Sequence, residues 1–384
     1  MNGSTRRRRI VHVVYSFGIG GLENVIVQLI NRLPHDLFEH VVLSLTTISD
    51  FKARVQRNDV QFIELRKPPG HAVPLYPRIW KFFRQLKPDV VHTCNLAALE
   101  VVPLAWLAGV PLRIHAEHGW DAHDTDGSNL RYQRLRRLYK PFVSHYVAVS
   151  QDIHDYLGRA IGVPVQRRSL IPNGVDTDQF HPAAARRQSV NGCPFDPAIH
   201  QIIGTVGRLQ TVKNQPLLAE AFVQLLQQHP ELVERVRLVI VGEGPLRANV
   251  ESILSEAGMA ALAWLPGARS DVADVLRMFT VFVLPSQTEG TSCTLQEAMA
   301  TGLPCVATAV GGNPALLSDG LGMLVPPGDV TVLSQSLYDV VTQADALHTT
   351  GRRAREHAVQ HFGIGSVVRE YERLFQVSAT GRRA

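Results

Sequence analysis

Short runs of aliphatic and β-branched residues recur along the 384-residue chain, and each is followed by a longer stretch with helical spacing of apolar residues. The runs are almost continuously apolar, which is typical of parallel strands covered on both faces. Strand–helix alternation at this spacing favours open, doubly wound α/β sheets. The predicted strands are residues 10–15, 41–45, 61–64, 90–92, 113–116 and 145–149, followed by 202–206, 237–241, 263–265, 281–284 and 305–308.

The alternation runs once to about residue 170 and begins again near residue 200, which predicts two domains. A chain of this length also exceeds what one ordinary core encloses. We expect an α/β architecture of two tandem Rossmann-like domains facing a central cleft, residues 1–170 and 171–363. Residues 181–197 are predicted to be hinge and exposed loop. The helical segment at about 364–384 is expected to pack back on the first domain.

Composition indicates the class of protein and its cellular location. A hydrophobic content of 45% with 19% charged residues is typical of globular chains. The four cysteines lack CxxC or CxxH spacing, which argues against a zinc site or a disulfide framework and favours a reducing, cytoplasmic location. The basic start lacks the apolar core of a signal peptide. The most apolar window, residues 96–112, contains charged and turn residues and predicts a buried helix rather than a membrane span.

A glycine-rich turn at residues 18–23 lies between the first predicted strand and a helix expected to begin near Glu23. Adjacent glycines, Gly20 and Gly21, let a backbone approach a phosphate, and a helix N-terminus offers free N–H groups. The dinucleotide fingerprint requires a small residue where Glu23 stands and an acidic residue after strand 41–45, where Thr46 and Thr47 follow instead. A tight strand-to-helix turn without a ligand remains the alternative.

A second loop follows strand 202–206 and leads to a helix that opens at Pro216. It carries Gly207, Arg208 and Lys213. Two cations five residues apart on a strand-end loop can converge on one diphosphate, Arg as a planar fork and Lys as a point charge. The strand–loop–helix setting favours this function over solvated surface cations.

A third loop follows strand 281–284 and contains two carboxylates, Glu289 and Glu297. Glu289 lies beside Gly290 at a strand end, where it can accept hydrogen bonds from sugar hydroxyls. Thr294 is predicted to cap the next helix, and backbone N–H groups from Thr291 onward would face the diphosphate. Glu297 has an alternative role, because the sequence from Thr294 to Glu297 also fits a capping box.

These residues resemble the retaining GT-B glycosyltransferases of the group 1, family 4 type, whose E-x7-E signature Glu289 and Glu297 reproduce. The resemblance covers nearly the whole chain. The Gly20–Glu23 turn is similar to the family's N-terminal donor loop. The segment from Asn173 to Asp176, with Phe180, is similar to the entry of the family's second domain. The sequence Gly242-Glu-Gly244-Pro245 is similar to a strand-end turn of that second domain. The Glu117-His-Gly119 tract and the sequence from Ser128 to Tyr139 are similar to sugar transferases linked to exopolysaccharide and PEP-CTERM sorting systems.

The resemblance implies roles for individual residues. His118 occupies the position of the family's cleft histidine beside the transferred sugar, Glu289 contacts the donor sugar, and Glu297 contacts the ribose. Thr291 and Ser292 stand where many relatives carry glycine or an aromatic residue, which leaves the hexose open. The expected catalytic residues are His118, Arg208, Lys213 and Glu289; the expected donor-binding residues are Gly20, Gly21, Asn173, Gly207, Gly290, Thr291, Ser292, Cys293, Thr294, Leu295 and Glu297.

We expect a retaining transferase that moves a hexose from a UDP- or GDP-sugar to a glycan or lipid-linked acceptor, without a metal or other cofactor. Arg208, Lys213 and helix N-termini supply the charge that a metal would provide. Asp124 and Asp126 resemble a DxD motif but lie in a polar loop, where exposed aspartates are usually solvated. A nucleotide-sugar epimerase or hydrolase, a nicotinamide-dependent oxidoreductase and a non-catalytic nucleotide-sugar-binding protein are the alternatives.

The charge distribution suggests where the acceptor lies. Residues 1–172 hold 23 Lys and Arg against 14 Asp and Glu, whereas residues 173–384 hold 16 against 20. A basic amphipathic helix is predicted near residues 131–142. Its polar side carries Arg134, Arg136, Arg137 and Lys140, and its apolar side carries Tyr132, Leu135, Leu138, Tyr139 and Phe142. We expect the first domain to rest on the anionic inner face of the membrane and predict no nucleic-acid partner. Packing of the apolar side on the sheet, with solvated cations, is the alternative.

Overall fold

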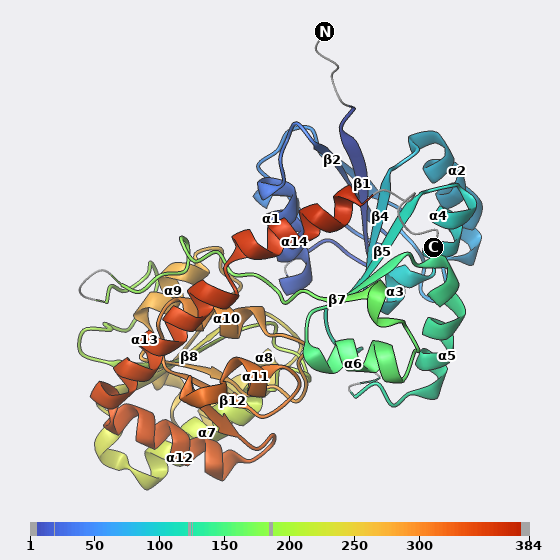
Figure 1. Cartoon of the computed structure of the whole chain (residues 1–384). Helices are drawn as coiled ribbons and strands as arrows, with labels where there is room; N and C mark the ends of the chain where they lie inside the picture. Colours follow the sequence, from blue (N-terminus) through green and yellow to red (C-terminus); the bar gives the residue numbers. More distant parts are fainter. Residues whose placement is uncertain (1–5, 19, 122–123, 125, 184–186, 378–384) are drawn as a thin grey trace. The chain divides into compact units, whose positions relative to one another are not determined.

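The computed structural model describes residues 6–18, 20–121, 124, 126–183 and 187–377 (Figure 1). The chain divides into two compact units. Unit 1 extends to Asn173 and is completed by the segment that begins at Ile364, whereas unit 2 is Gly174–Gly363. None of the helices in the described part of the chain has the length and apolar content needed to span a bilayer.

Unit 1 is built on a seven-stranded parallel sheet in the order β3-β2-β1-β4-β5-β6-β7. Its strands are β1 (Arg8–Val14), β2 (Phe38–Ser44), β3 (Gln61–Glu64), β4 (Val90–Cys94), β5 (Leu112–Glu117), β6 (His145–Ala148) and β7 (Arg168–Leu170). Its helices are α1 (Gly21–Arg32), α2 (Tyr76–Leu86), α3 (Asn95–Leu99), α4 (Val102–Leu107), α5 (Leu130–Tyr139), α6 (Gln151–Arg159) and α14 (Ile364–Gln376), with 3-10 turns η1 (Asp50–Arg54), η2 (Val73–Leu75), η3 (Lys140–Phe142) and η4 (Val165–Arg167).

The helices of unit 1 cover both faces of its sheet, because alternate residues of each strand point to opposite sides. Helices α1 and α14 pack on the face that carries Ile10, Val42 and Val90. Helices α2, α3 and α4 cover the other face at Val11 and Val91. Figure 1 shows α14 lying beside β1 and α1, so this C-terminal helix covers part of the first sheet.

Unit 2 is built on a six-stranded parallel sheet in the order β10-β9-β8-β11-β12-β13. Its strands are β8 (Gln201–Val206), β9 (Val236–Val241), β10 (Ala263–Gly267), β11 (Val281–Leu284), β12 (Cys305–Thr308) and β13 (Met323–Val325). Its helices are α7 (Gln215–Gln228), α8 (Arg247–Glu256), α9 (Val272–Met278), α10 (Cys293–Ala300), α11 (Asn313–Leu316), α12 (Val330–Thr342) and α13 (Ala344–His361), with 3-10 turns η5 (Pro230–Leu232), η6 (Ala260–Leu262) and η7 (Ser318–Gly320).

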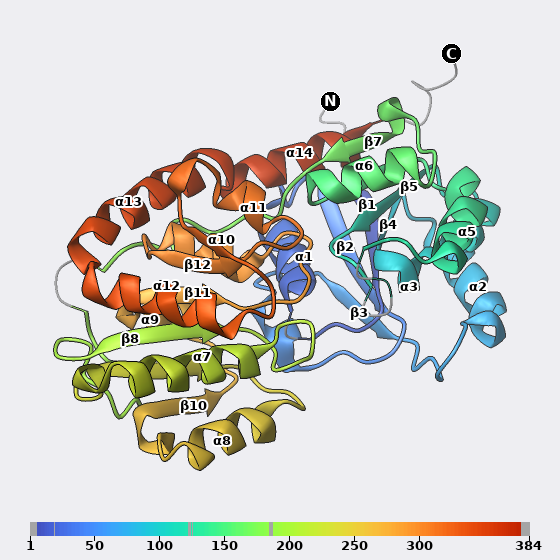
Figure 2. The same cartoon turned by 90° about the horizontal axis from the view of Figure 1, so that it is seen from below.

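Two apolar clusters hold unit 2 together, one on each face of the sheet. Helices α7, α8 and α12 pack against β8, β9 and β11 in one cluster. Helices α9, α10 and α13 contribute to the other. Figure 2 shows α7 and α8 together on the same side of this sheet.

The segment that follows the first unit is a loop with one buried aromatic anchor. We predicted that residues 181–197 form hinge and exposed loop, and its described residues form no helix or strand and are mostly exposed or half-buried. Phe195 is buried in a core cluster of unit 2, and the Arg187 guanidinium donates to Thr280 Oγ1 over 2.8 Å. An isolated aromatic residue in a Pro- and Arg-rich stretch has no periodic pattern to mark it as buried.

Candidate active site

The strand order of unit 2 reverses between β8 and β11, because β9 and β10 lie on one side of β8 and β12 and β13 lie beyond β11. In open α/β sheets, ligands bind beyond the carboxyl ends of the strands at such a reversal. The loop after β8 carries Lys213, and the loop after β11 carries Glu289. Both side chains therefore lie where the topology of the fold favours a ligand.

The two loops meet through a buried carboxylate. Lys213 Nζ donates to Glu289 Oε1 over 2.5 Å, and Ser286 Oγ donates to the same oxygen over 2.6 Å. The Glu289 side chain is 8% exposed, so both contacts are largely screened from water. A second link is made by the backbone, where Gln287 N donates to Val212 O over 2.9 Å. The predicted sugar-binding carboxylate and the predicted phosphate-binding cation thus form one hydrogen-bonded ion pair.

Glycines let neighbouring loops brace this pair. A Cβ atom on Gly311, whose φ is +51°, would lie 1.8 Å from the carbonyl oxygen of Glu289. Gly312 N donates to Gly290 O over 2.8 Å. On the other side, a Cβ atom on Gly242 (φ +140°) would lie 1.9 Å from the carbonyl oxygen of Gly207. Only residues without a side chain fit at these two backbone contacts.

Arg208 and Gly207 begin the loop that ends at Lys213. Gly207 N donates to Val241 O, which continues the β8–β9 pairing by one residue. The Arg208 side chain is exposed, whereas its carbonyl oxygen accepts from Gln215 Nε2 over 3.0 Å. The fixed backbone therefore presents the guanidinium outward, as a phosphate-binding residue requires.

Helix α10 begins with Cys293, and Ser292 is its N-cap. The Ser292 hydroxyl accepts from Leu295 N over 3.3 Å. Our prediction that Thr294 caps this helix is wrong, because both residues are good caps and the chain turns two residues earlier. Glu297 then falls beyond the first turn, so the capping-box explanation of this carboxylate no longer applies. Thr291, Ser292 and Leu295 are buried, and Cys293, Thr294 and Glu297 are half-buried.

In unit 1, His118 directly follows β5 and is held from two sides. Its backbone N donates to Asn95 Oδ1 over 2.7 Å, and its Nδ1 lies 3.3 Å from Asn173 Oδ1. Burial lowers the pKa of His118 to about 4, although the bond to Asn173 acts in the opposite direction. The imidazole is therefore neutral at physiological pH, and Nδ1 donates its proton to the Asn173 amide oxygen. The structure thus brings together two of the predicted site residues.

The glycine turn of unit 1 leads directly into α1, which begins at Gly21 rather than near Glu23. Gly20 is the N-cap residue in extended backbone, and its carbonyl oxygen accepts from Asn24 N over 3.0 Å. A Cβ atom on Gly20 would lie 2.2 Å from Glu23 Oε2. Ile19, within the predicted glycine-rich turn, lies outside the described residues.

A buried ion pair lies beside His118. Glu117 accepts from Arg136 Nε over 2.7 Å and from Arg136 Nη2 over 3.2 Å, and both side chains are almost fully buried. Burial alone would raise the pKa of Glu117, but Arg136 and His115 hold it well below its usual range. The pair ties α5 to the end of β5. Arg136 therefore does not belong to a solvated basic face, which corrects the helical-wheel prediction at this residue.

Two further cations of the predicted basic face are also engaged within unit 1. Arg137 donates to Ala160 O over 2.9 and 2.6 Å, and Lys140 Nζ donates to Ile161 O and Gly162 O. Arg134 is exposed, and on the apolar side Leu138 is exposed as well. A wheel drawn from sequence cannot show which cations reach a neighbouring carbonyl.

The predicted DxD-like loop has a structural role in its described part. Asp124 is buried, and its Oδ1 accepts from Asn129 N over 2.9 Å, just before α5. Asp126 Oδ1 accepts from Ser128 N over 3.0 Å. We expected exposed, solvated aspartates, and this is wrong for Asp124. Thr125 lies outside the described residues.

Comparison with protein families settles the class. Residues 19–179 match the family model described as Glycosyltransferase Family 4, and residues 200–343 match the one described as Glycosyl transferases group 1. The chain belongs to this glycosyltransferase family. Two models in tandem correspond to the two sheets, and the resemblance carried by Glu289 and Glu297 is confirmed at the level of the family.

Curated relatives of this glycosyltransferase cover much of its length. It is 26% identical over 394 aligned residues to the UDP-Gal:alpha-D-GlcNAc-diphosphoundecaprenol alpha-1,3-galactosyltransferase of Escherichia coli, with 98% of both chains covered. It is also 26% identical to the putative glycosyltransferase EpsF of Bacillus subtilis, with 80% of both chains covered.

Solved structures confirm the fold. Anabaena Alr3699/HepE, determined with UDP and glucose, matches with a TM-score of 0.80 and 20% identity over 96% of this chain and 99% of that one. WaaG, a glycosyltransferase involved in lipopolysaccharide biosynthesis, matches with a TM-score of 0.76 and 16% identity over 96% and 99%. The two parallel α/β sheets of this glycosyltransferase thus have the GT-B fold.

Sequence reasoning missed three residues that shape this site. Ser286 donates to Glu289, while Gly311 and Gly312 pack against the backbone of the Glu289 loop. A pair of glycines shortly after the predicted strand 305–308 was the available signal. Ser286 gave no such signal, because serine is common on loops that follow strands.

Proposed function

We propose that this glycosyltransferase moves a hexose from a UDP-sugar to a lipid-linked acceptor with retention of anomeric configuration. The observation that carries the proposal is the Lys213–Glu289 pair at the β8–β11 reversal. It joins a cation suited to a diphosphate and a carboxylate suited to sugar hydroxyls at the point where the fold favours a ligand. The names of two similar proteins support UDP as the nucleotide.

We assign the charges of unit 2 to the departing nucleoside diphosphate. Arg208 and Lys213 stabilise the negative charge that develops as the sugar–phosphate bond breaks. The N-terminus of α10, near Ser292 and Cys293, adds backbone N–H groups and the positive end of a helix dipole. These groups supply the positive charge locally, so we propose that transfer needs no divalent metal.

Lys213 must change partner during this reaction. In the structure its Nζ donates to Glu289 Oε1, and with a nucleotide bound we expect it to turn to the diphosphate. Both observed bonds to the Glu289 carboxylate end on Oε1, so we assign Oε2 to the donor sugar. We assign neutral His118 to a hydroxyl of the same sugar, as the family resemblance implies, and Glu297 to the ribose.

Retention is supported by the linkage in the name of a similar protein. The Escherichia coli enzyme is named as an alpha-1,3-galactosyltransferase that uses UDP-Gal, and common UDP-hexoses carry an α bond to the diphosphate. We propose attack on the same face that the diphosphate leaves, with a phosphate oxygen accepting the proton of the acceptor hydroxyl. Glu289 is engaged by Lys213 and Ser286, which makes it a binding group rather than a nucleophile.

The acceptor proposal rests on the same comparison. The Escherichia coli enzyme is named for an acceptor sugar attached to diphosphoundecaprenol. We propose that this chain also glycosylates a lipid-linked sugar, in a pathway that builds an exopolysaccharide. The Glu117–Gly119 tract supports this pathway by its similarity to transferases of that kind.

We propose that unit 1 docks on anionic lipid through neighbouring helices α2, α4 and α5. Trp106 is 52% exposed and Leu138 is 64% exposed, and Trp80 of α2 is exposed beside Arg84. Helix α2 packs on α4 (Figure 1). The η3 turn contacts both α4 and α5. Exposed apolar side chains flanked by cations are the pattern of an interfacial membrane contact.

The transfer proposal is tested by incubating the protein with UDP- and GDP-hexoses and an undecaprenol-linked sugar. We expect a glycosylated lipid from a UDP-hexose after exhaustive chelation of metals, with the anomeric configuration of the donor kept in the NMR spectrum of the product. An inverted product would contradict retention. Hydrolysis or epimerisation without transfer would contradict the acceptor proposal, and metal-rescued turnover would contradict metal independence.

Vesicle co-sedimentation tests the membrane proposal. We expect binding to vesicles with anionic lipid, loss of that binding as salt rises, and weaker binding by Trp106→Gln and Leu138→Gln variants. Leu324→Gln, which changes an exposed leucine of unit 2, serves as the matched control. Equal binding to neutral and anionic vesicles, or equal loss in the control, would contradict this docking surface.

A further inference from the structure

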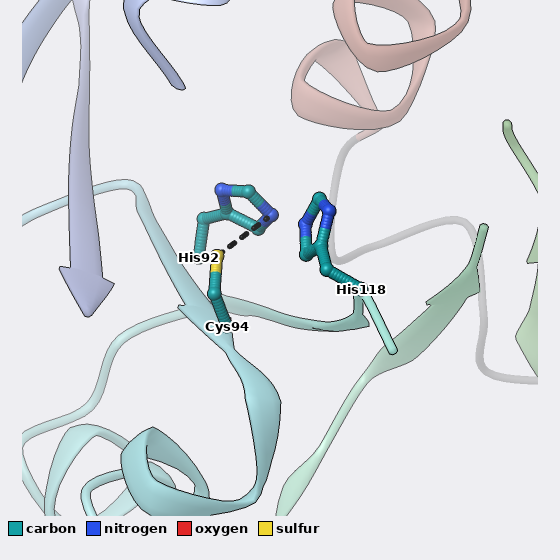
Figure 3. A group of neighbouring side chains, drawn as sticks. All are labelled: His92, Cys94 and His118. Atoms are coloured by element: carbon teal, nitrogen blue, oxygen red, sulfur yellow. Dashed lines mark hydrogen bonds between the residues drawn. The ribbon is translucent and has the colours of Figure 1, made fainter. Parts of the chain in front are cut away.

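A cluster of two histidines and a cysteine lies at the carboxyl ends of β4 and β5 in unit 1. His92 and Cys94 are two residues apart on β4, so their side chains point to the same face of the sheet. His118 follows the neighbouring strand β5. One ligand atom from each of the three residues lies within 4.8 Å of the other two, as Figure 3 illustrates. The cluster lies at the strand-order reversal of unit 1, between β1 and β4.

The spacing within the cluster suits a tetrahedral metal ion. His92 Nε2 lies 3.8 Å from Cys94 Sγ. Two ligands of one tetrahedral zinc, with a Zn–N bond of about 2.0 Å and a Zn–S bond of about 2.3 Å, are separated by about 3.5 Å. His92 and Cys94 are therefore already placed close to the required separation. A ligand atom of His118 lies within 4.8 Å of both, so a small adjustment of this side chain completes the set.

His118 presents a free ligand atom to the cluster. Its Nδ1 is 3.3 Å from Asn173 Oδ1, and an amide oxygen only accepts hydrogen bonds. The ring proton is therefore on Nδ1, and Nε2 carries the lone pair. This Nε2 is buried and has no hydrogen-bond partner among the described residues. A metal-ligating histidine usually has this arrangement, with its other nitrogen tied to a protein oxygen.

His92 is oriented by a chain of buried histidines. Its Nδ1 lies 3.1 Å from His12 Nδ1, and His12 Nε2 lies 3.1 Å from His40 Nδ1. If His92 donates along this chain, its Nε2 is left as an acceptor facing Cys94 Sγ. If the chain runs the other way, the Nε2–H of His92 points at the sulfur instead. The chain thus allows both a metal-free tautomer and a metal-binding tautomer without movement of the rings.

We propose that His92, Cys94 and His118 form a binding site for Zn²⁺, with a solvent oxygen as the fourth ligand. Two imidazoles and one thiolate are a donor set that zinc accepts, and three protein ligands leave one position open. Binding displaces the Cys94 thiol proton to the buffer and forms Zn–S and Zn–N bonds, with no change of oxidation state.

Zinc at this site inhibits transfer, a consequence that rests on the proposed role of His118 in sugar binding. The lone pair of His118 Nε2 cannot bind zinc and contact the donor sugar at the same time. The ion therefore competes with the sugar for one nitrogen atom. In this scheme zinc is an inhibitor and not a cofactor, so transfer without metal and inhibition by zinc are compatible.

The site itself is tested with Co²⁺, because a thiolate bound to cobalt gives a charge-transfer absorption band that needs no enzyme activity. We expect the band in the wild-type protein and its loss in Cys94→Ala and Cys94→Ser. Cys305→Ala removes another buried cysteine, on β12, and should keep the band. Thermal unfolding shows whether each variant is folded, and His118→Gln should weaken cobalt binding by at least about tenfold while a band remains at saturation.

The inhibition is tested with Zn²⁺ in the transfer assay. We expect micromolar zinc to suppress wild-type turnover, a chelator to restore it, and Cys94→Ser to need at least about tenfold more zinc. Absence of the cobalt band at saturation, or its persistence in both Cys94 variants, would overturn the site. A band with undiminished turnover in zinc would overturn the competition. A band in a protein without transferase activity would support the site and contradict the proposed function.

Discussion

The strand order of unit 1 reverses between β1 and β4, and that of unit 2 reverses between β8 and β11. In unit 2 the ionisable groups at this point, Lys213 and Glu289, lie on loops after the strands. In unit 1 they lie within or directly after the strands and include His12, His92 and Cys94. All the fully buried histidines of the described chain belong to unit 1: His12, His40, His92, His115 and His145.

This difference shows that the strand-order reversal of an α/β sheet can carry ionisable groups of two different kinds. A charged pair on braced loops can exchange its internal partner for an anionic ligand, which suits binding of a diphosphate. Neutral imidazoles and a thiol within a sheet can change tautomer or take up a soft cation, but they cannot accept a proton without loss of stability. Acid, substitution of buried charges and nucleotide binding should therefore affect the two units differently.

The largest effect that we expect is acid destabilisation of unit 1. Burial lowers the pKa of His12 and His92 well below the usual value and lowers that of His40 to about 3. In the unfolded chain each titrates near 6.5, so below this pH the unfolded state binds more protons and stability falls as pH falls. Each histidine contributes about 2 kcal/mol of this loss between about pH 6.5 and about pH 5.

Hydrogen exchange at neutral pH and at about pH 5 measures this effect unit by unit. Amides of β1, β2 and β4 should lose protection at the lower pH, whereas those of β8 and β11 should keep it. Equal loss of protection in both sheets would contradict a role of buried histidines in acid sensitivity, because unit 2 has no fully buried histidine in its described residues.

Arg136→Met should produce the next largest effect. It leaves the Glu117 carboxylate buried without its cation, which costs about 3 to 5 kcal/mol in the free energy of unfolding at neutral pH. Arg134→Met on the same helix changes an exposed cation and should stay within about 0.5 kcal/mol. Urea unfolding gives both values.

The cause of the Arg136 effect can be checked with a second substitution. Glu117→Gln in the Arg136→Met background removes the unpaired charge and should recover part of the lost stability. If the single variant is as stable as Arg134→Met, the buried pair does not anchor α5.

Glu289→Gln should lower kcat by about 10² to 10³, because a neutral amide replaces the carboxylate proposed to hold the donor sugar. This substitution keeps the side-chain volume, whereas Glu289→Ala would also leave Ser286 and Lys213 without their buried partner. Steady-state turnover provides the measurement, and Glu256→Gln, an exposed carboxylate on α8, is the matched control. Normal turnover in folded Glu289→Gln protein would remove Glu289 from the site.

The smallest expected effects concern nucleotide affinity. Lys213→Ala and Arg208→Ala should each weaken UDP binding by about tenfold, since each removes a charge-assisted bond to phosphate. Glu289→Gln should bind UDP at least as tightly as the wild type, because Lys213 no longer has to leave a carboxylate. Calorimetric titration with UDP tests all three, with Arg352→Ala as an exposed control. Weaker binding by Glu289→Gln would contradict the exchange of partners by Lys213.

Much of the fold could be predicted from the sequence, because each central strand is an apolar run with a helix behind it. Each of the eleven predicted strands is present, with ends that differ by at most three residues. The two missed strands, β7 and β13, lie at sheet edges and have three residues each, too few to show a pattern. Edge strands also need fewer apolar residues, since one side of the backbone has no neighbour.

The candidate site could be predicted in unit 2 and only in part in unit 1. Glycines, Lys213 and Glu289 stand out on loops, where such residues have few structural reasons to occur. His92 and Cys94 lie inside an apolar strand, where a single histidine or cysteine usually belongs to the core. Their relation to His12 depends on the register of β1 against β4, and their relation to His118 depends on the path of the chain after β5.

The return of the chain to unit 1 at α14 affects how the protein is made. The seven strands of unit 1 leave the ribosome first, but the helix that contributes Tyr371 and Phe375 beside His92 is synthesised last. All of unit 2 is translated in between, which at about 5–20 residues per second takes roughly 10 to 40 seconds. During that interval the face of the first sheet that carries His12 and His92 is not covered by α14. Unit 1 is therefore synthesised first but completed last. A chain that stops at Gly363 would contain every element of unit 2, whereas unit 1 would lack α14.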